Sequence, residues 1–190
     1  MSALIRAMAK RQFVAFLRAV NVGGRFVTME RLRALFANLG LERVRSHIQS
    51  GNVFFETART DRKALEREIA EYLAAELGFE CPAFLRTPAE LEKALSIDAF
   101  ARIKVTPDVR LAVLFTADPL PKKLALPHRS PKGDCDIVAA TASELFIVAR
   151  NLGGRPGNPL AYVEKTLGIT GTIRFHATAV KILEAAKGKA

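Results

Sequence analysis

Two short segments of the N-terminal half combine glycine, amide side chains and arginine, which are the parts of a site for an anion. Bare backbone N–H groups at a glycine turn, a helix N-terminus and guanidinium groups all attract phosphate or carboxylate oxygens. The first segment spans residues 18–25 and the second spans residues 49–52. The candidate ligand-binding residues in them are Arg18, Asn21, Gly23, Gly24, Arg25, Gln49, Ser50 and Asn52.

Both segments also have a purely structural interpretation. The Gly23-Gly24 pair fits neither the Gly-x-Gly-x-x-Gly dinucleotide pattern nor the phosphate-binding loop, which needs Gly-Lys followed by Ser or Thr. A glycine pair can supply positive φ to a tight turn, and Ser50-Gly51 can close a two-residue hairpin. The case for an anion site therefore depends on the two segments coming together.

The elements around the segments predict that they share one edge of a sheet. Residues 13–20 form an apolar run typical of a buried strand, and Thr28 suits the N-cap of a helix that Gly40 ends. Residues 44–49 alternate as a second strand. In a right-handed β-α-β unit these strands run parallel, so both segments follow carboxyl ends at the same edge. We predict one site there, beside the N-terminus of the helix.

The rest of this half predicts a ferredoxin-like subdomain over residues 12–86. A third strand follows the hairpin turn, a helix capped by Thr60 runs to Gly78, and residues 82–86 form a fourth strand. The order β-α-β-β-α-β is the split β-α-β arrangement. Such a sheet carries both helices on one face, yet residues 13–17 are apolar on both faces. We expect the C-terminal half to cover the second face.

The C-terminal half, residues 87–190, is predicted to be a smaller α+β subdomain. A helix begins at Thr87-Pro88, a strand follows at residues 109–117, and residues 136–149 contain a hairpin. A helix capped by Asn158-Pro159, a short strand and a closing helix complete it. The predicted fold class is therefore α+β, with a ferredoxin-like N-terminal half packed against this C-terminal half.

The same segments resemble a large bacterial family of domains of unknown function, DUF1697. The likeness is carried by the stretch from Phe16 to Gly24, by the stretch from Met29 to Gly40, and by the stretch from Ile48 to Val53 with Phe55. Members usually read Leu-Arg-Gly-Ile-Asn-Val-Gly-Gly and then Tyr-Ile-Gln-Ser-Gly-Asn-Val, and Ala19 stands where the first of these glycines is usual. The resemblance implies a two-part α+β fold with a ferredoxin-like first half, and it implies no reaction.

The end of the chain resembles the family's closing motif only in part. Members close with Thr-x-Arg-Asn-Trp-Asn-Thr and a following Lys. The matching positions hold Thr172, Arg174, Thr178 and Lys181, while Phe175, His176 and Ala177 replace the Asn-Trp-Asn core. The resemblance adds Arg174 to the candidate ligand-binding residues. It also implies that any family function resting on those amides and that indole is altered here.

Metal and covalent chemistry find no support in the sequence. Cys81 and Cys135 are the only cysteines, and they lie far apart outside any Cys-x-x-Cys pattern. The three histidines are scattered and form no His-Glu-x-x-His motif. In Asp134-Cys135-Asp136 the two carboxylates would raise the pKa of the thiol, which is the wrong direction for a nucleophile. We predict neither a metal nor a cofactor.

Charge and length limit the partners. The 190 residues include 29 Lys and Arg against 19 Asp and Glu, a net charge of +10 that attracts polyanions. Single-strand binders also need exposed aromatic residues, and the twelve Phe mostly fall in core-like runs, so a solvated basic surface is favoured. No apolar run approaches the ~18 residues of a membrane span. Residues 1–11 look like a flexible extension rather than an export signal, so we expect a cytoplasmic protein without a membrane partner.

Three functions stay open at this level. The first is a module that binds an anionic ligand, either a nucleotide, a phosphorylated metabolite or nucleic acid. The second is an enzyme acting on a phosphorylated small molecule, with Arg18, Arg174 or a glycine-loop amide stabilising negative charge. The third is an interaction or structural protein whose glycines only shape turns. The sequence predicts no oligomeric state.

Overall fold

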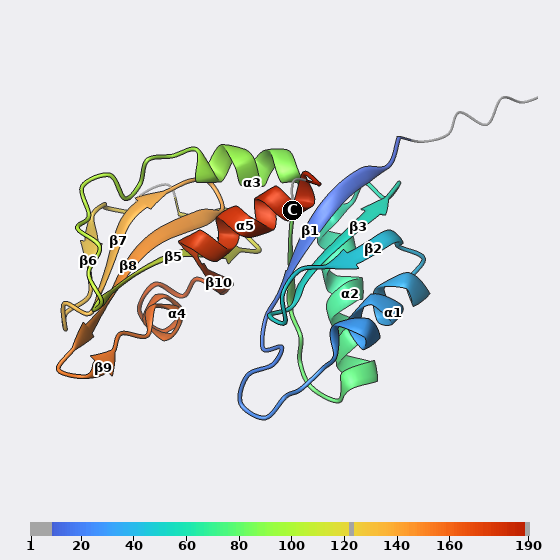
Figure 1. Cartoon of the computed structure of the whole chain (residues 1–190), viewed down its shortest axis with the longest axis horizontal. Helices are drawn as coiled ribbons and strands as arrows, with labels where there is room; N and C mark the ends of the chain where they lie inside the picture. Colours follow the sequence, from blue (N-terminus) through green and yellow to red (C-terminus); the bar gives the residue numbers. More distant parts are fainter. Residues whose placement is uncertain (1–8, 122–123, 189–190) are drawn as a thin grey trace, which may run out of the picture. The chain divides into compact units, whose positions relative to one another are not determined.

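The computed structural model describes residues 9–121 and 124–188 (Figure 1). Of the predicted extension over residues 1–11, the first eight lie outside the described residues, and Arg11 already begins the first strand. The chain divides into two compact units, residues 1–87 and 88–190, so the second unit is the longer in sequence rather than the smaller. Both units combine helices with antiparallel sheets, which confirms the α+β class.

The first unit is a four-stranded sheet with the strand order β2-β3-β1-β4. Every neighbouring pair is antiparallel, so β1 and β2 run parallel to one another with β3 between them. This is the ferredoxin-like order, and both helices lie on the same side of the sheet (Figure 1). Its elements are β1 (Arg11–Leu17), α1 (Met29–Asn38), β2 (Glu42–Ser46), β3 (Asn52–Thr57), α2 (Arg62–Leu77) and β4 (Ala83–Arg86).

Alternation along the strands and helical spacing build one core in this unit. Phe13, Ala15 and Leu17 alternate on the face of β1 that meets the helices, because successive strand residues point to opposite faces. The ring of Phe55 on β3 lies 5.7 Å from the rings of both Phe13 and Phe36. The core is completed by Leu32 and Leu35 of α1, Leu65, Ile69 and Leu73 of α2, and Ala83 and Leu85 of β4.

The helix signals in this unit are mostly confirmed. The hydroxyl of Thr28 accepts a hydrogen bond from the N–H of Arg31 at 3.1 Å, as an N-cap should. Gly78 ends α2 with a φ of 75°. The predicted cap of α2 is wrong by one residue, because the Asp61 carboxylate, not Thr60, accepts from the N–H of Ala64 at 3.0 Å.

Two strand boundaries differ from the prediction. β1 ends at Leu17 instead of continuing to residue 20, and Ala19 beyond it has a φ of 64°, which a strand does not allow. The turn between β2 and β3 is longer than the predicted Ser50-Gly51 pair. β2 ends at Ser46, and the next bond, from the N–H of residue 47 to the carbonyl of Asn52 at 3.1 Å, encloses four residues.

The second unit contains a six-stranded antiparallel sheet with the main order β10-β5-β8-β7-β6, and β9 pairs with β8. Leu114, Ile137, Leu145 and Ile147 form a core with Val163. Helix α5 contacts α3, β5 and β10. The elements are α3 (Pro88–Leu95), β5 (Val109–Thr116), β6 (His128–Arg129), β7 (Cys135–Ala140), β8 (Glu144–Leu152), β9 (Arg155–Pro156), α4 (Pro159–Tyr162), the π-helical η1 (Val163–Leu167), β10 (Gly171–Phe175) and α5 (His176–Ala186).

The predicted cap of the helix that begins at Pro159 is confirmed, because the Asn158 side chain accepts a hydrogen bond from the N–H of Ala161 at 3.1 Å. The β8–β9 hairpin was not predicted. Packing of the two halves against one another stays a prediction.

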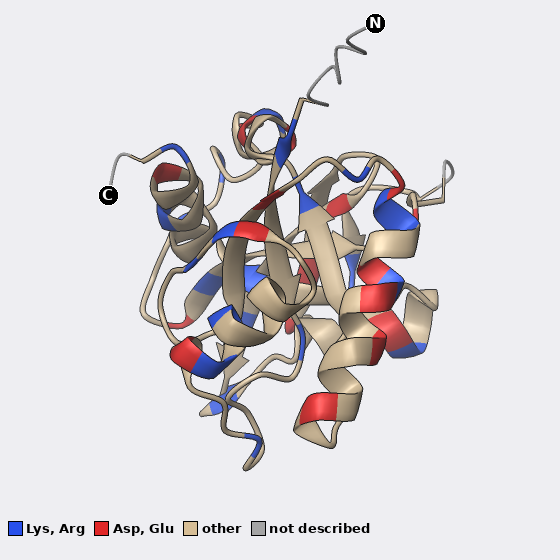
Figure 2. Ribbon diagram, turned by 90° about the vertical axis from the view of Figure 1, so that its right-hand side faces the viewer, with Lys and Arg blue, Asp and Glu red and all other residues tan. Residues whose placement is uncertain are grey.

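Basic and acidic residues are interspersed along the long helix α2 of the first unit (Figure 2). No helix in the described part of the chain is long and apolar enough to cross a bilayer.

Candidate functional site

The side chain of Asn21 joins the two segments that carry the candidate residues. Its Nδ2 donates to the carbonyl of Gln49 at 2.9 Å, and its Oδ1 accepts from the N–H of Val27 at 2.8 Å. The first bond ties the loop after β1 to the β2–β3 hairpin, and the second closes the loop at its base. We call residues 18–28 and 47–52 together the loop junction, whose first loop projects beyond the end of the sheet (Figure 1).

Backbone contacts fix the loop junction to the end of β1. The N–H of Leu17 donates to the carbonyl of Gly51 at 2.8 Å, and the N–H of Arg18 donates to the carbonyl of Pro82 at 2.9 Å. A Cβ on Gly51 would lie 3.0 Å from the Cβ of Val20 and 3.1 Å from that of Leu17. Gly51 is therefore required for a close approach of the hairpin to β1, as well as for its φ of 68°.

Asn52 shapes the hairpin from within. Its side chain is fully buried, and Nδ2 donates to the hydroxyl of Ser50 at 2.8 Å and to the carbonyl of His47 at 3.3 Å. Gln49 is exposed, and its carbonyl receives the Asn21 side chain. Asn21, Ser50 and Asn52 thus have structural contacts that account for the motif without a ligand. Any ligand-binding role for them stays a prediction.

The Gly23-Gly24 pair forms the tip of the first loop. Both residues have positive φ, 58° and 81°, as a type I′ turn requires, and the N–H of Arg25 donates to the carbonyl of Val22 at 3.1 Å. A Cβ on either glycine would meet nothing within 4 Å, so glycine is needed for its φ alone. Within the described residues the N–H groups of Gly23 and Gly24 have no hydrogen-bond partner. Both N–H groups are therefore available to a ligand.

Arg25 lies over an aromatic ring at this end of the unit. Its guanidinium carbon is 5.3 Å from the ring centroid of Phe79, a cation–π contact that leaves the residue exposed. The charge of Arg25 acts on the Cys81 thiol, whose pKa it lowers. Burial raises the pKa of the Cys81 thiol to about 12, against the weaker lowering effect of Arg25, so this thiol does not supply a nucleophile.

Arg174 belongs to the second unit, on β10. Its Nη1 donates to the hydroxyl of Thr172 at 3.0 Å and to the carbonyl of Ile173 at 2.8 Å, and burial lowers its pKa to about 10. The neighbouring His176 begins α5, and its ring lies 5.2 Å from that of Phe100. The participation of Arg174 in the same site as the loop junction stays a prediction.

Backbone strain is concentrated in the loop junction. The described residues other than glycine with positive φ are four, and three of them are Ala19, Asn21 and Ile48, with φ values of 64°, 57° and 50°. A β-branched residue such as Ile48 is an outlier there, because its side chain crowds the backbone. Strained residues of this kind gather at functional sites. The fourth, Arg43, lies at the irregular pairing within β2.

The Ala19→Gly variant should be more stable than the wild type by about 0.5–1 kcal/mol, because glycine adopts a φ of 64° without the clash of a Cβ. The free energy of unfolding in urea measures this. The matched control, Ala34→Gly, makes the same change at an exposed position inside α1 and should cost about 1 kcal/mol. A loss of stability in both variants would contradict the assignment of strain to Ala19.

The loop junction also exposes apolar side chains that the sequence did not reveal. Val22, Phe26 and Ile48 are 57%, 71% and 48% exposed, and Phe26 is the most exposed large apolar residue in the described part of the chain. The expectation that Phe residues fall mostly in the core is correct for Phe13, but Phe26 departs from it. Its position directly after the glycine turn was the signal available in the sequence.

The motif at the tip occurs a second time in the chain. Asn21-Val22-Gly23-Gly24-Arg25 is matched by Asn151-Leu152-Gly153-Gly154-Arg155 in the β8–β9 hairpin. Gly153 and Gly154 have φ values of 58° and 77°, close to those of the first pair. The two segments have the same kind of turn. They differ after the arginine, where Phe26 follows Arg25 and Pro156 follows Arg155.

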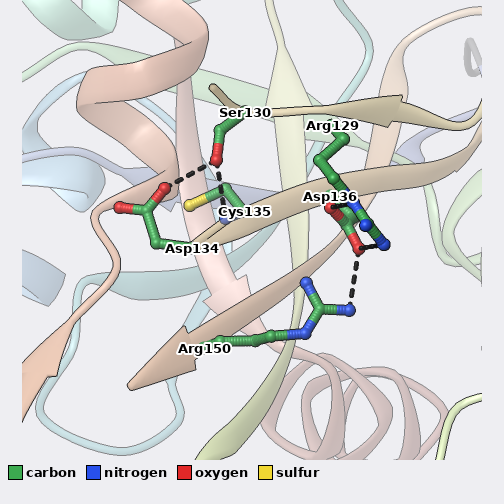
Figure 3. Close-up of polar contacts among 6 residues, drawn as sticks. All are labelled: Arg129, Ser130, Asp134, Cys135, Asp136 and Arg150. Carbon is green, nitrogen blue, oxygen red and sulfur yellow. Dashed lines mark hydrogen bonds and ion pairs between the residues drawn. The ribbon is translucent and has the colours of Figure 1, made fainter. Parts of the chain in front are cut away.

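A separate polar cluster surrounds Cys135 in the second unit (Figure 3). The buried carboxylate of Asp136 accepts from Arg129 Nε at 3.0 Å and from Arg150 Nη2 at 2.7 Å. The Ser130 hydroxyl donates to Asp134 at 2.6 Å and accepts from the N–H of Cys135 at 3.0 Å. Burial, together with the flanking carboxylates, raises the pKa of the Cys135 thiol to about 11. The cluster therefore holds strands together and lacks an activated thiol.

Metal-ligand side chains are not gathered at either place. Among the residues that the structure describes, no three or more His, Cys, Asp or Glu side chains lie together where they could hold a metal ion. The loop junction contains the guanidinium groups of Arg18 and Arg25 and no carboxylate side chain, which suits an anion better than a cation.

These features define a ferredoxin-like unit with a two-loop junction at one end of its sheet, followed by a second α+β unit. A model of the family described as "Protein of unknown function (DUF1697)" matches residues 10–146, and the chain belongs to this family. No curated protein matches the chain.

Among solved structures, the chain is similar to the conserved bacterial protein SP0830 from Streptococcus pneumoniae. The two are 23% identical, with a TM-score of 0.67, and the match covers 94% of this chain and 99% of the other. At that identity the likeness supports the fold and says nothing about the ligand or reaction.

Proposed function

We propose that the loop junction binds an anionic ligand, namely a nucleotide, a phosphorylated metabolite or nucleic acid. The observation that carries this proposal is the bond from Asn21 to Gln49, which holds the glycine turn against the hairpin. The held turn presents the N–H groups of Gly23 and Gly24, and the exposed guanidinium of Arg25 follows them directly. Backbone donors beside a guanidinium group form an arrangement that suits phosphate oxygens.

The local charge supports the same proposal. Residues 18–52 contain six arginines and two glutamates, so this stretch carries 6 − 2 = +4. The enzyme alternative gains no support from Cys81, because burial raises the pKa of its thiol above the ordinary value. The Ser50 hydroxyl, a second potential nucleophile, accepts a hydrogen bond from the Asn52 amide.

A thermal-shift titration with a nucleoside triphosphate, inorganic triphosphate and short oligonucleotides tests the proposal. A ligand at a hundred times its Kd stabilises the folded state by about 2.7 kcal/mol, which should raise the Tm of the first unit by several degrees. The Arg25→Ala variant should bind roughly tenfold or more weakly, because it loses a charge-assisted contact.

The second hairpin offers the matched control for this variant. Arg155→Ala removes an exposed arginine from the equivalent turn, Gly153-Gly154, and should leave the titration unchanged. Equal weakening by both variants would show that only general positive charge is involved. If none of the anions raises the Tm, the proposed function is wrong.

A further inference from the structure

We infer that the ligand of the loop junction is single-stranded nucleic acid, whose bases stack on Phe26 while its phosphates meet the Gly23-Gly24 N–H groups and Arg25. This inference rests on the anion-binding function proposed above and specifies its ligand. The aromatic ring and the guanidinium group come from consecutive residues, so one short stretch of chain offers both contacts.

Phe26 exposes its aromatic ring to solvent. Its 71% exposure at a turn is unfavourable in water, and two further apolar side chains, Val22 and Ile48, are exposed in the same junction. The Asn21 side chain bonds to Val27 and Gln49, which directly follow Phe26 and Ile48 in the chain. Val22 directly follows Asn21 itself. The apolar group is therefore held in place by the two Asn21 bonds.

A surface that combines an aromatic ring with positive charge fits a ligand that has both apolar faces and phosphates. Bases have an apolar face that stacks on aromatic side chains, and the connecting phosphates need positive charge and N–H donors close by. The junction lies in a stretch with a charge of +4. This charge favours a polyanion as the ligand over a protein surface that has few acidic residues. In a duplex the base faces are already stacked, so a single strand is the form that Phe26 can engage.

The available contacts also determine how specific the binding is for sequence. None of the contacts inferred here reads a base edge, because both polar atoms of the Asn21 side chain are used within the junction and the Arg25 guanidinium group is assigned to phosphate. Binding through a ring face, N–H groups and a guanidinium group is tolerant of sequence. We therefore expect little preference among oligonucleotides of different composition.

Fluorescence anisotropy with three labelled probes tests the inference on the full chain. The probes are a thymidine oligonucleotide of about twelve nucleotides, an abasic strand of equal length and charge, and a duplex of that length. The wild type should bind the thymidine strand about 5- to 100-fold more tightly than the abasic strand. Phe26→Ala should abolish that advantage and leave affinity for the abasic strand unchanged, whereas Phe26→Tyr should retain it.

Further variants separate the contacts. Arg25→Ala should weaken the thymidine and abasic strands alike, whereas Leu152→Ala in the second hairpin, also an exposed apolar residue beside a Gly-Gly turn, should weaken neither. Phe26→Leu keeps an apolar side chain but no ring, so full affinity in that variant would overturn stacking. The exposure of Phe26 means that these variants should keep the wild-type Tm.

Failure of the inference and failure of the proposed function give different results. Equal affinity for the thymidine and abasic strands, or tightest binding to the duplex, overturns the inference and leaves anion binding standing. Binding of none of the three probes, together with no thermal shift from any anion, overturns both. A protein or membrane partner would be indicated by Phe26-dependent association in the absence of nucleic acid, and this too would overturn the inference.

Discussion

Gly51→Ala is expected to lower the free energy of unfolding of the first unit by roughly 2–3 kcal/mol, through unfavourable φ and overpacking. The new Cβ would lie 3.0 Å from the Cβ of Val20 and 3.1 Å from that of Leu17, and the φ of 68° disfavours any residue with a Cβ. Relief would require the hairpin to move away from β1, which would weaken the bond from Leu17 to residue 51. Urea denaturation measures the loss.

Gly40→Ala is the matched control for this variant. Gly40 has a φ of 73°, and a Cβ there would meet nothing within 4 Å, so the control carries the φ penalty alone, about 1 kcal/mol. The difference between the two variants measures the close packing of the hairpin on β1. Equal losses would contradict that packing. Because the hairpin holds Asn21 through Gln49, Gly51→Ala should also weaken anion binding, whereas Gly40→Ala should not.

Asp136→Asn is expected to lower the free energy of unfolding of the second unit by roughly 2–4 kcal/mol, because it leaves two guanidinium groups without their buried carboxylate. The Asp136 side chain is 7% exposed and lies between Arg129 and Arg150. The Glu68→Gln control removes an exposed pair with Arg59 at 2.7 Å and should cost at most about 0.5 kcal/mol. Similar losses in both variants would show that burial of Asp136 adds nothing.

The pH dependence of this difference has a defined sign. Burial alone would raise the pKa of Asp136, but the hydrogen bonds and charges of Arg129 and Arg150 outweigh it and hold that pKa below its ordinary value. The stabilisation is complete above the ordinary aspartate pKa of about 3.9 and is lost as the pH falls through the lowered folded-state pKa. The gap between wild type and Asp136→Asn should therefore close in acid. A gap that widens there would contradict the ion pairs.

Local signals were enough to predict most of the elements. Thr28 as N-cap and Gly78 as helix end follow from side-chain and backbone properties within one turn, and both are confirmed. The alternation of Phe13, Ala15 and Leu17 identified the core face of β1 in the same way. The order of strands and helices then predicted the ferredoxin-like sheet, since few topologies accommodate it.

Boundaries and turns were less predictable, because they depend on backbone angles that the residue type does not determine. Ala19 and Ile48 adopt positive φ against their own preference, so the end of β1 and the length of the β2–β3 turn could not be derived from propensity. The surrounding contacts impose these angles. The repeated Asn-x-Gly-Gly-Arg pattern, in contrast, was present in the sequence and predicts a turn in both places.

The sequence by itself determined that two polar segments follow parallel strands, and hence that they lie at one end of the sheet. Only the tertiary structure decided what each residue does there. Asn21 and Asn52 bond within the loops, while Arg25 and the ring of Phe26 stay exposed. The physical reason is that a side chain's hydrogen bonds and exposure depend on partners distant in sequence, such as Gln49 for Asn21, and residue types along the chain do not specify those partners.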